Sequence, residues 1–252
     1  MEYWIWLTMI KGIGPVTANR LLDKFDSPAS VYQADRPCLE LTGCLTSRQI
    51  ELILENRDIS KAFRVMEQCK SMNISILTKL DAEYPEKAKR YVDSPIILYY
   101  KGQIRDIGRS VGIVGARRCT QLDKLKVSEL TVKFTADNKT IVSGMAKGID
   151  SYAHTECLNS EGYTIAIVGN GLDICYPSEH VKLMEAIEDR GLLLSEYPPG
   201  TRPSRYTFPQ RNRLISAWSD ELVVIGAGKG SGALITAGIA RKQGKRVMEF
   251  GA

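Results

Sequence analysis

The sequence predicts an α/β protein in which a doubly wound, mostly parallel sheet follows a small all-helical domain. Two observations predict this fold class. In residues 1–75 the apolar positions recur every three or four residues, which is the helical period. From residue 110 the pattern changes to short, nearly continuous runs of apolar, often β-branched residues separated by helical patterns. Such strands are buried on both faces between helices, so the second region has a Rossmann-like fold.

The helical region reads as two helix–turn–helix units. Helical spacing covers residues 3–10, 17–25 and 47–54, with breaks at the KGIGP and LTGCLT segments. The first unit resembles a helix-hairpin-helix, in which glycines let backbone N–H groups approach a phosphate. A Gly-x-Gly turn also serves plain packing. We favour packing, because residues 1–100 carry 13 Lys and Arg against 13 Asp and Glu.

A connector, residues 76–109, follows the helical domain. It contains Tyr84-Pro85 and Ser94-Pro95 and then the strand-like run IILYY. Because so many of its residues are apolar, we expect it to pack on the second domain, residues 110–252.

Glycines and cations gather where the predicted strands of the second domain end. Strands are expected in residues 110–116, 139–144, 163–171, 192–196, 221–228 and 245–250. The loops after four of them are rich in glycine, and three of these loops carry Lys or Arg. Ligands of such sheets bind at the carboxyl ends of the strands. Glycines let the backbone approach a phosphate and the cations add charge-assisted contacts, so we predict a phosphate-bearing ligand. The predicted contacts in these loops are Gly115, Arg117, Arg118, Lys147, Gly148, Gly169, Gly171, Lys229 and Ser231.

The stretch FPQRNRLISAWSD, residues 208–220, adds Arg211, Asn212 and Arg213 just before a predicted strand, with no acid before Asp220. Residues 202–213 hold four arginines and no acid, which suggests an anionic partner, although a solvated charged face is the plain alternative. Tyr206 and Phe208 flank the arginines and are candidates for base stacking. Phe208 and Trp218 also fit a core position, which is commoner for aromatic residues near an apolar strand.

Other kinds of chemistry have little support in the sequence. GxxxxGK[ST] and GxSxG are absent. Residues 228–233 fit GxGxxA, but this unit comes last, without the βαβ continuation that a dinucleotide site uses. Asp150 and His154 share a helix face and form a conceivable acid–base pair, but we favour a hydrogen bond between them inside the helix. We therefore predict no catalytic residues and no cofactor.

The composition also bears on location and metals. The six cysteines are scattered without CxxC or Cys/His ligand spacing, which predicts reduced thiols and no metal. The sequence shows neither a signal peptide nor an apolar run long enough to span a bilayer. We expect a cytoplasmic protein with no membrane partner.

Six motifs in the second region resemble those of the DprA/Smf family of DNA-processing proteins. They are GARRCT, IVSGMAKGIDSYAH, TIAIVGNGLDICYP, LLSEYPPGTRP, FPQRNRLIS and SGALITA. The resemblance covers residues 75–250, and the helical domain is similar to the family's SAM-like domain. By position, Arg117 matches the basic residue of the family's DNA-binding Gly-Ser/Ala-Arg motif. Arg211, Asn212 and Arg213 fall in its FPxRNR motif.

The resemblance implies a single-stranded DNA-binding protein of DNA processing, recombination and natural transformation (competence). Such proteins protect incoming DNA and help to load the RecA recombinase, as homodimers joined through the Rossmann-like domain and without enzymatic activity. Ser178 and His180 depart from the family pattern, which often has a basic residue and Asn there. We also expect the family's C-terminal winged-helix domain, and part of the usual dimer surface, to be absent.

Two alternatives come from other classes. One is a nucleotide phosphoribohydrolase-like enzyme that uses the glycine-rich phosphate loops, although an Arg and Glu pair matching that family's catalytic residues is not found. The other is a pure protein-interaction module, in which the arginines have no nucleic-acid role.

Overall fold

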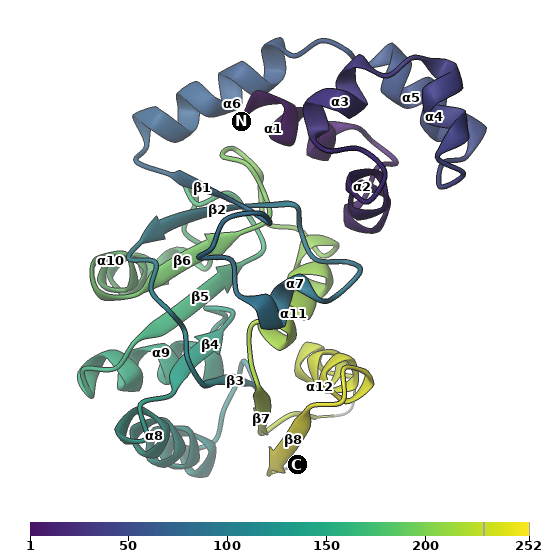
Figure 1. Ribbon diagram of the computed structural model, residues 1–252. Coiled ribbons are helices and arrows are strands. Elements are labelled where there is room, and N and C mark those ends of the chain that lie inside the picture. The colour runs from purple at the N-terminus through teal and green to yellow at the C-terminus, as the bar shows by residue number, and fades with distance from the viewer. Residues whose placement is uncertain (229, 252) are drawn as a thin grey trace. The chain divides into compact units, whose positions relative to one another are not determined.

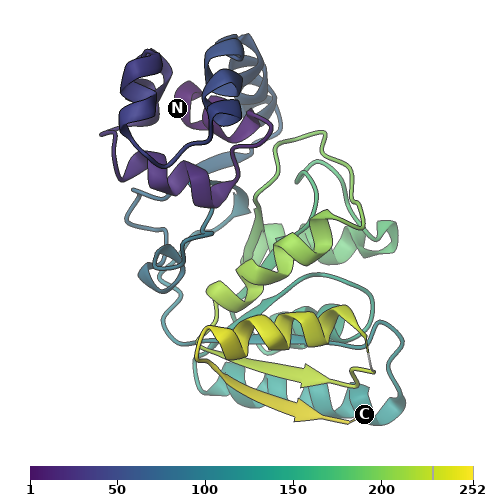
Figure 2. The same ribbon diagram turned by 90° about the vertical axis from the view of Figure 1, so that its right-hand side faces the viewer.

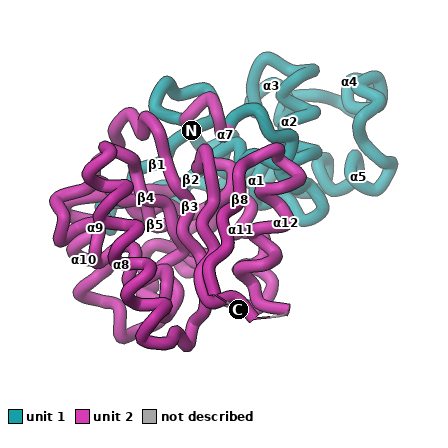
Figure 3. The backbone as a smooth tube through the Cα atoms, turned by 90° about the horizontal axis from the view of Figure 1, so that it is seen from below, with its two compact units in different colours: residues 1–84, 89–98 teal, residues 85–88, 99–252 magenta. Residues whose placement is uncertain are grey.

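The computed structural model describes residues 1–228 and 230–251, and the chain divides into two compact units (Figure 3). Unit 1 comprises residues 1–84 and 89–98, and unit 2 comprises residues 85–88 and 99–252. The predicted connector is therefore divided, which differs from the expectation that all of it packs on the second domain. A physical reason lies in Asn19, whose side-chain amide donates to the carbonyls of Val92 (3.4 Å) and Ser94 (2.7 Å).

Unit 1 is built from short helices whose N-termini the sequence marks. Thr46 and Gln49 form a capping box, and the side chains of Ser27 and Asp35 cap the helices that follow them. At the predicted hairpin, Gly12 has a φ of +88° and its carbonyl accepts a hydrogen bond from the Gln49 side chain at 3.0 Å. The elements are α1 (Glu2–Met9), α2 (Pro15–Leu22), α3 (Pro28–Gln33), α4 (Arg36–Leu41), α5 (Ser47–Glu55), α6 (Ser60–Ser71) and β1 (Ser75–Thr78).

Unit 2 alternates strands with helices, as the sequence predicts. Among the described residues of unit 2 the sheet has the strand order β2-β6-β5-β4-β3-β7-β8. Its pairings from β6 to β8 are parallel, and β2 is antiparallel to β6. The elements are α7 (Glu86–Lys89), β2 (Ile97–Gly102), β3 (Ser110–Gly115), α8 (Gln121–Ala136), β4 (Thr140–Ser143), α9 (Ile149–Asn159), β5 (Thr164–Val168), η1 (Ser178–His180), α10 (Val181–Arg190), β6 (Leu192–Ser195), α11 (Thr207–Ala217), β7 (Glu221–Ile225), α12 (Gly232–Lys242) and β8 (Arg246–Phe250).

Helices cover both faces of this sheet, which makes the fold doubly wound and Rossmann-like (Figure 1). Helices α8, α9 and α10 pack on one face, while α11 and α12 pack on the other. Figure 2 shows α12, in yellow, lying along β7 and β8. The fully buried Val111, Ile113, Ile141 and Val223 join Val127 of α8 in one core cluster. The four residues other than Val127 come from the apolar runs that predicted the strands.

The strand order determines where a ligand site can form. From β3 the chain proceeds outward through β4, β5 and β6, and it then returns through α11 to add β7 and β8 on the other side of β3. The loops that follow β3 and β7 therefore diverge to opposite faces. Doubly wound sheets open at such a switch point, at the carboxyl edge of the strands.

Candidate functional site

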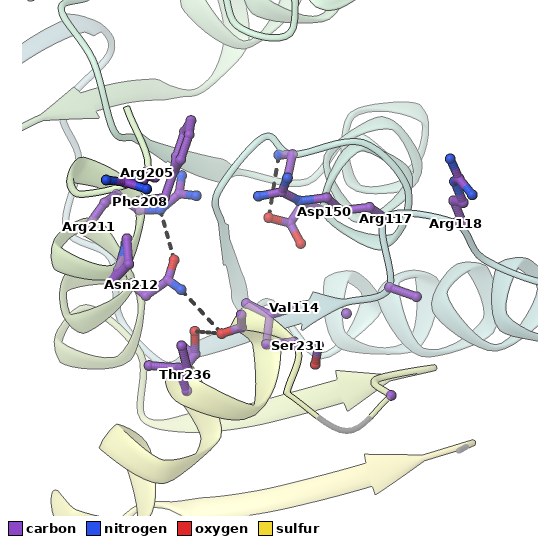
Figure 4. A pocket seen from close by; sticks show the side chains of 18 of the residues that line it. Val114, Arg117, Arg118, Asp150, Arg205, Phe208, Arg211, Asn212, Ser231 and Thr236 are labelled. Atoms are coloured by element: carbon purple, nitrogen blue, oxygen red, sulfur yellow. Dashed lines mark hydrogen bonds between the residues drawn. The ribbon is translucent and has the colours of Figure 1, made fainter. Parts of the chain in front are cut away.

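A groove of about 870 Å³ opens at this switch point, and all of its lining residues belong to unit 2 (Figure 4). The loop after β3 forms one wall, the start of α11 with the loop before it forms another, and the N-terminus of α12 closes the third side. The polar and aromatic lining residues are Arg117, Arg118, Asp150, Tyr176, Ser204, Arg205, Phe208, Arg211, Asn212, Ser231 and Thr236.

Three arginines give the groove its open positive charge. Arg117, Arg118 and Arg205 are exposed, and within the described part of the chain none of them forms an ion pair with an acid. The Arg117 guanidinium lies 5.9 Å from the centroid of the Phe208 ring. Arg118 is the member of this group drawn farthest from Arg211 in Figure 4. Unpaired guanidinium groups that face one cavity are suited to binding an anion with several phosphates.

Arg211 forms part of the groove floor and is only 5% exposed. Its Nη1 donates to the carbonyl oxygens of Gly144 (2.6 Å) and Ile167, and its Nε donates to Asn212 Oδ1 at 3.1 Å. A Cβ atom at position 144 would lie 2.6 Å from the guanidinium carbon, so only glycine fits beside it. Burial lowers the pKa of Arg211 to about 10, an effect that the charge of Asp150 opposes. Arg211 is thus a buried cation held in one geometry.

Asp150 and His154 have structural partners, and these are not each other. Asp150, in the first turn of α9, accepts hydrogen bonds from the backbone N–H groups of Gly144 (3.2 Å) and Ala146 (3.4 Å). Burial raises the pKa of Asp150, against the influence of Arg211. His154 Nδ1 lies 2.7 Å from Thr164 Oγ1, and burial lowers the pKa of His154 to about 3. The expected hydrogen bond between Asp150 and His154 is wrong, because both side chains turn toward the neighbouring strands and loops instead.

The N-terminus of α12 adds backbone donors to the groove. Ser231 is the N-cap residue, yet its side chain makes no capping bond, and its buried Oγ has no hydrogen-bond partner among the described residues. The Gly232 carbonyl accepts hydrogen bonds from Asn212 Nδ2 and Thr236 Oγ1, each at 3.3 Å. A helix N-terminus carries a partial positive charge, so this end of the groove favours an anion.

The structure brings together only part of the predicted site. Seven predicted residues line the groove, namely Gly115, Arg117, Arg118, Phe208, Arg211, Asn212 and Ser231. Lys147 and Gly169 line an adjoining hollow of about 60 Å³. Gly148, Gly171, Tyr206 and Arg213 line neither cavity. Lys229 lies outside the described residues.

Two predicted phosphate ligands are cations with acid partners. The sequence suggested that no acid balances Arg213, but its Nη2 lies 2.6 and 2.7 Å from the Glu196 carboxylate oxygens, at the end of β6. Lys147 pairs with Glu179 at 2.7 Å. Both acids are distant in sequence, so composition along the chain did not reveal them.

The glycines and aromatic residues also have specific explanations. A Cβ atom on Gly148 would lie 2.2 Å from the Ala116 carbonyl oxygen, and the Gly171 N–H donates to Thr201 at 2.9 Å, so these two glycines serve loop packing. Trp218 is fully buried, as expected of a core residue. Phe208 is not a core residue, because it is half-buried and lines the groove.

Sequence reasoning missed Tyr176, which lines both cavities and whose ring centroid lies 5.5 Å from that of Phe208. It also did not single out Arg205 from the basic stretch. The only signal for Tyr176 was its place in GLDICYP after a predicted strand, and that position does not reveal its contact with α11.

The fold and the groove together define a Rossmann-like α/β protein with a basic binding site at the carboxyl edge of its sheet. The profile of the DNA recombination-mediator protein A family matches residues 75–251. The chain belongs to this family.

Named relatives agree with the family assignment. The chain is 36% identical to Protein Smf of Synechocystis over 98% of its own length and 64% of that relative. It is 34% identical to the DNA processing protein DprA of Bacillus subtilis, over 86% of this chain and 76% of the relative. The chain thus spans less than two thirds of the Synechocystis protein.

Two solved structures are also similar. The X-ray structure of DprA from Streptococcus pneumoniae has a TM-score of 0.84 and 29% identity, and the match covers 99% of this chain and 86% of that one. A structure of DNA processing protein A from Helicobacter pylori has a TM-score of 0.65 and 31% identity, over 70% of this chain and 80% of that one. The Helicobacter pylori structure is described as giving insight into a unique single-stranded DNA binding mode of that protein. In the described part of this chain, the helices are too short or too polar to cross a membrane.

Proposed function

We propose that this protein binds single-stranded DNA in its basic groove, as a DNA-processing and natural-transformation protein. The observation that carries the proposal is the convergence of Arg117, Arg118 and Arg205 on one cavity that also contains a helix N-terminus. Single-stranded DNA supplies phosphates at a regular spacing, which suits several cations along a groove. The DNA-binding mode named for the Helicobacter pylori relative supports the same ligand.

Within this proposal the predicted residues take different roles. Arg117, Arg118 and Arg205 contact phosphates directly, and Arg211 with Asn212 forms the positive floor beneath them. Gly115 and Ser231 place backbone groups in the lining of the groove, beside the bound DNA. Arg213 and Lys147 are less suited to phosphate contacts, because each has a carboxylate partner.

The proposal is a binding function without catalysis. Asp150 and His154 are the titratable pair that sequence reasoning weighed as acid and base, and both are engaged in buried hydrogen bonds. A histidine whose pKa is about 3 is a poor proton carrier near neutral pH. Release of adenine from adenosine monophosphate at an enzymatic rate would favour the phosphoribohydrolase-like alternative instead.

The resemblance and the family's name also suggest two protein partners, a RecA recombinase and a second copy of this chain. We propose that the bound strand is protected and passed to a RecA recombinase, which fits the description of a recombination mediator. We also propose a homodimer formed through unit 2. Among the described residues β8 is an outer strand of the sheet, and such an edge is a common place for association.

The test is fluorescence anisotropy of a labelled single strand, with the same sequence as a duplex for comparison. Wild type should prefer the single strand, and Arg117→Ala and Arg205→Ala should each weaken binding several-fold. Arg202→Ala is the matched control, because Arg202 is an exposed arginine of the same loop that does not line the groove. Equal losses in Arg202→Ala and Arg205→Ala would place the strand elsewhere, and absence of binding by wild type would overturn the function.

A further inference from the structure

We propose that Tyr176 is the platform on which a base of the bound strand stacks. This inference rests on the proposed function, because it assigns the base contact within the same groove. Tyr176 is 45% exposed and lines both the main groove and the adjoining hollow. It follows β5 in the loop 169–177, away from the basic stretch 202–213 that drew attention in the sequence.

The Tyr176 ring packs against the ring of Phe208. Its centroid lies 5.5 Å from that of Phe208, and the two ring planes are tilted by 30°. A ring contact of this kind restricts the side chain before a ligand binds, so less side-chain entropy is lost on binding. Tyr176 remains 45% exposed beside this contact, so part of its surface is open to a ligand.

Phe208 is less suited to this role because its ring already has several neighbours. The Tyr176 ring and the Arg117 guanidinium lie near it, and a Cβ atom on Gly169 would come within 3.1 Å of its Cδ1. Phe208 is therefore a support that joins the platform to the cation. Arg117 then lies on one side of Phe208 and is available to a phosphate near a base stacked on Tyr176.

Tyr206 is more exposed, at 66%, but it lines neither cavity. Its ring lies 4.9 Å from the Arg205 guanidinium, and its hydroxyl accepts a hydrogen bond from Arg205 Nη2 at 2.7 Å. Tyr206 thus orients an arginine. It also provides a matched control, because it is an exposed tyrosine in contact with the same groove's cations.

The experiment separates base contacts from phosphate contacts with two single-stranded probes of equal length, one normal and one an abasic deoxyribose-phosphate chain. Aromatic stacking of one base is worth about 5- to 150-fold in affinity. Tyr176→Ala should weaken binding of the normal strand by a factor in this range and leave binding of the abasic strand unchanged. Tyr176→Phe, which retains the ring, should bind both probes as wild type does. Tyr206→Ala should show no such difference between the probes.

The other outcomes distinguish a failure of the Tyr176 platform from a failure of the proposed binding of single-stranded DNA. If Tyr176→Ala weakens binding of both probes equally, or of neither, while wild type binds DNA, the platform is overturned and the function stands. If wild type binds neither probe, both proposals fail. A photocrosslink from 5-iodouracil in the bound strand gives a readout on the unmutated protein. Crosslinking at Tyr176 supports the platform, and crosslinking at Tyr206 or Phe208 instead contradicts it.

Discussion

Arg211 lies in a charged stretch of the sequence, but in the folded protein it is a buried structural residue. Its guanidinium is buried against two backbone carbonyls and lies within electrostatic reach of Asp150. Gly144 leaves the space that it occupies. A buried cation of this kind holds the loop after β4 and the end of β5 to α11, so its role combines structure with the electrostatics of the groove.

Removing Arg211 should therefore destabilise the protein as well as weaken ligand binding. Arg211→Ala leaves the Asp150 carboxylate buried without its cation, which should reduce the free energy of unfolding by about 3–5 kcal/mol. Asp150→Asn in the same chain should restore part of that loss, because it removes the uncompensated charge. Urea unfolding of the wild type, the two single variants and the double variant measures the coupling between Arg211 and Asp150. A double variant no more stable than Arg211→Ala would contradict it.

His154 should make stability fall in acid. Its pKa is about 3 in the folded protein, compared with 6.5 in the unfolded chain. Below pH 6.5 only the unfolded chain takes up this proton, so stability is present above that pH and is lost progressively down to about pH 3. Between pH 7 and pH 5 the loss attributable to His154 should be about 2 kcal/mol.

Urea unfolding at pH 7 and pH 5 tests this prediction. The difference in unfolding free energy between pH 7 and pH 5 should be smaller in His154→Gln than in the wild type. His180→Gln is the control, because His180 is the other of the two histidines in the sequence. An unchanged pH dependence in His154→Gln would mean that other groups cause it.

At the scale of elements, α12 has an N-terminus that lacks a side-chain cap. Ser231→Asp should add both a cap and a favourable charge at the positive end of the helix, which should raise stability by about 0.5–1 kcal/mol. The same negative charge should weaken single-stranded DNA binding several-fold, because it competes with a phosphate. Thermal unfolding and anisotropy measure the two effects.

Ser231→Asn is the matched control for this element, because asparagine caps a helix without charge. It should increase stability similarly while retaining more of the affinity. If Asp and Asn change the affinity equally, the N-terminus of α12 does not face a phosphate.

At the scale of the whole molecule, the charge distribution predicts how binding depends on salt. Four arginines line the groove, and for single strands each neutralised phosphate contributes about −0.7 to the slope of log K against log salt, so the slope should be about −3. Arg205→Ala should reduce its magnitude by about 0.7. Titrations at several salt concentrations measure both slopes. A flat dependence would argue against phosphate binding in the groove.

The fold class, the strands of unit 2 and the edge of the sheet that carries the candidate site could be predicted from the amino-acid sequence. Apolar periodicity reports burial locally, and glycines and cations after strands gather at one edge of a parallel sheet. Arg117 and Ser231 were predicted in this way, Arg211 was predicted from the acid-free arginine stretch before a strand, and all three line the groove.

Which of the candidate residues share a cavity could not be predicted from the sequence and follows from contacts in the folded protein. Glu196 neutralises Arg213 across a contact between β6 and α11, and Tyr176 meets Phe208 from another loop. Likewise, Gly148 is required by a neighbouring carbonyl and not by a ligand. Each of these facts depends on segments that are far apart in the chain and meet only when the sheet assembles, because ion pairing, ring contact and close packing are properties of distance in space.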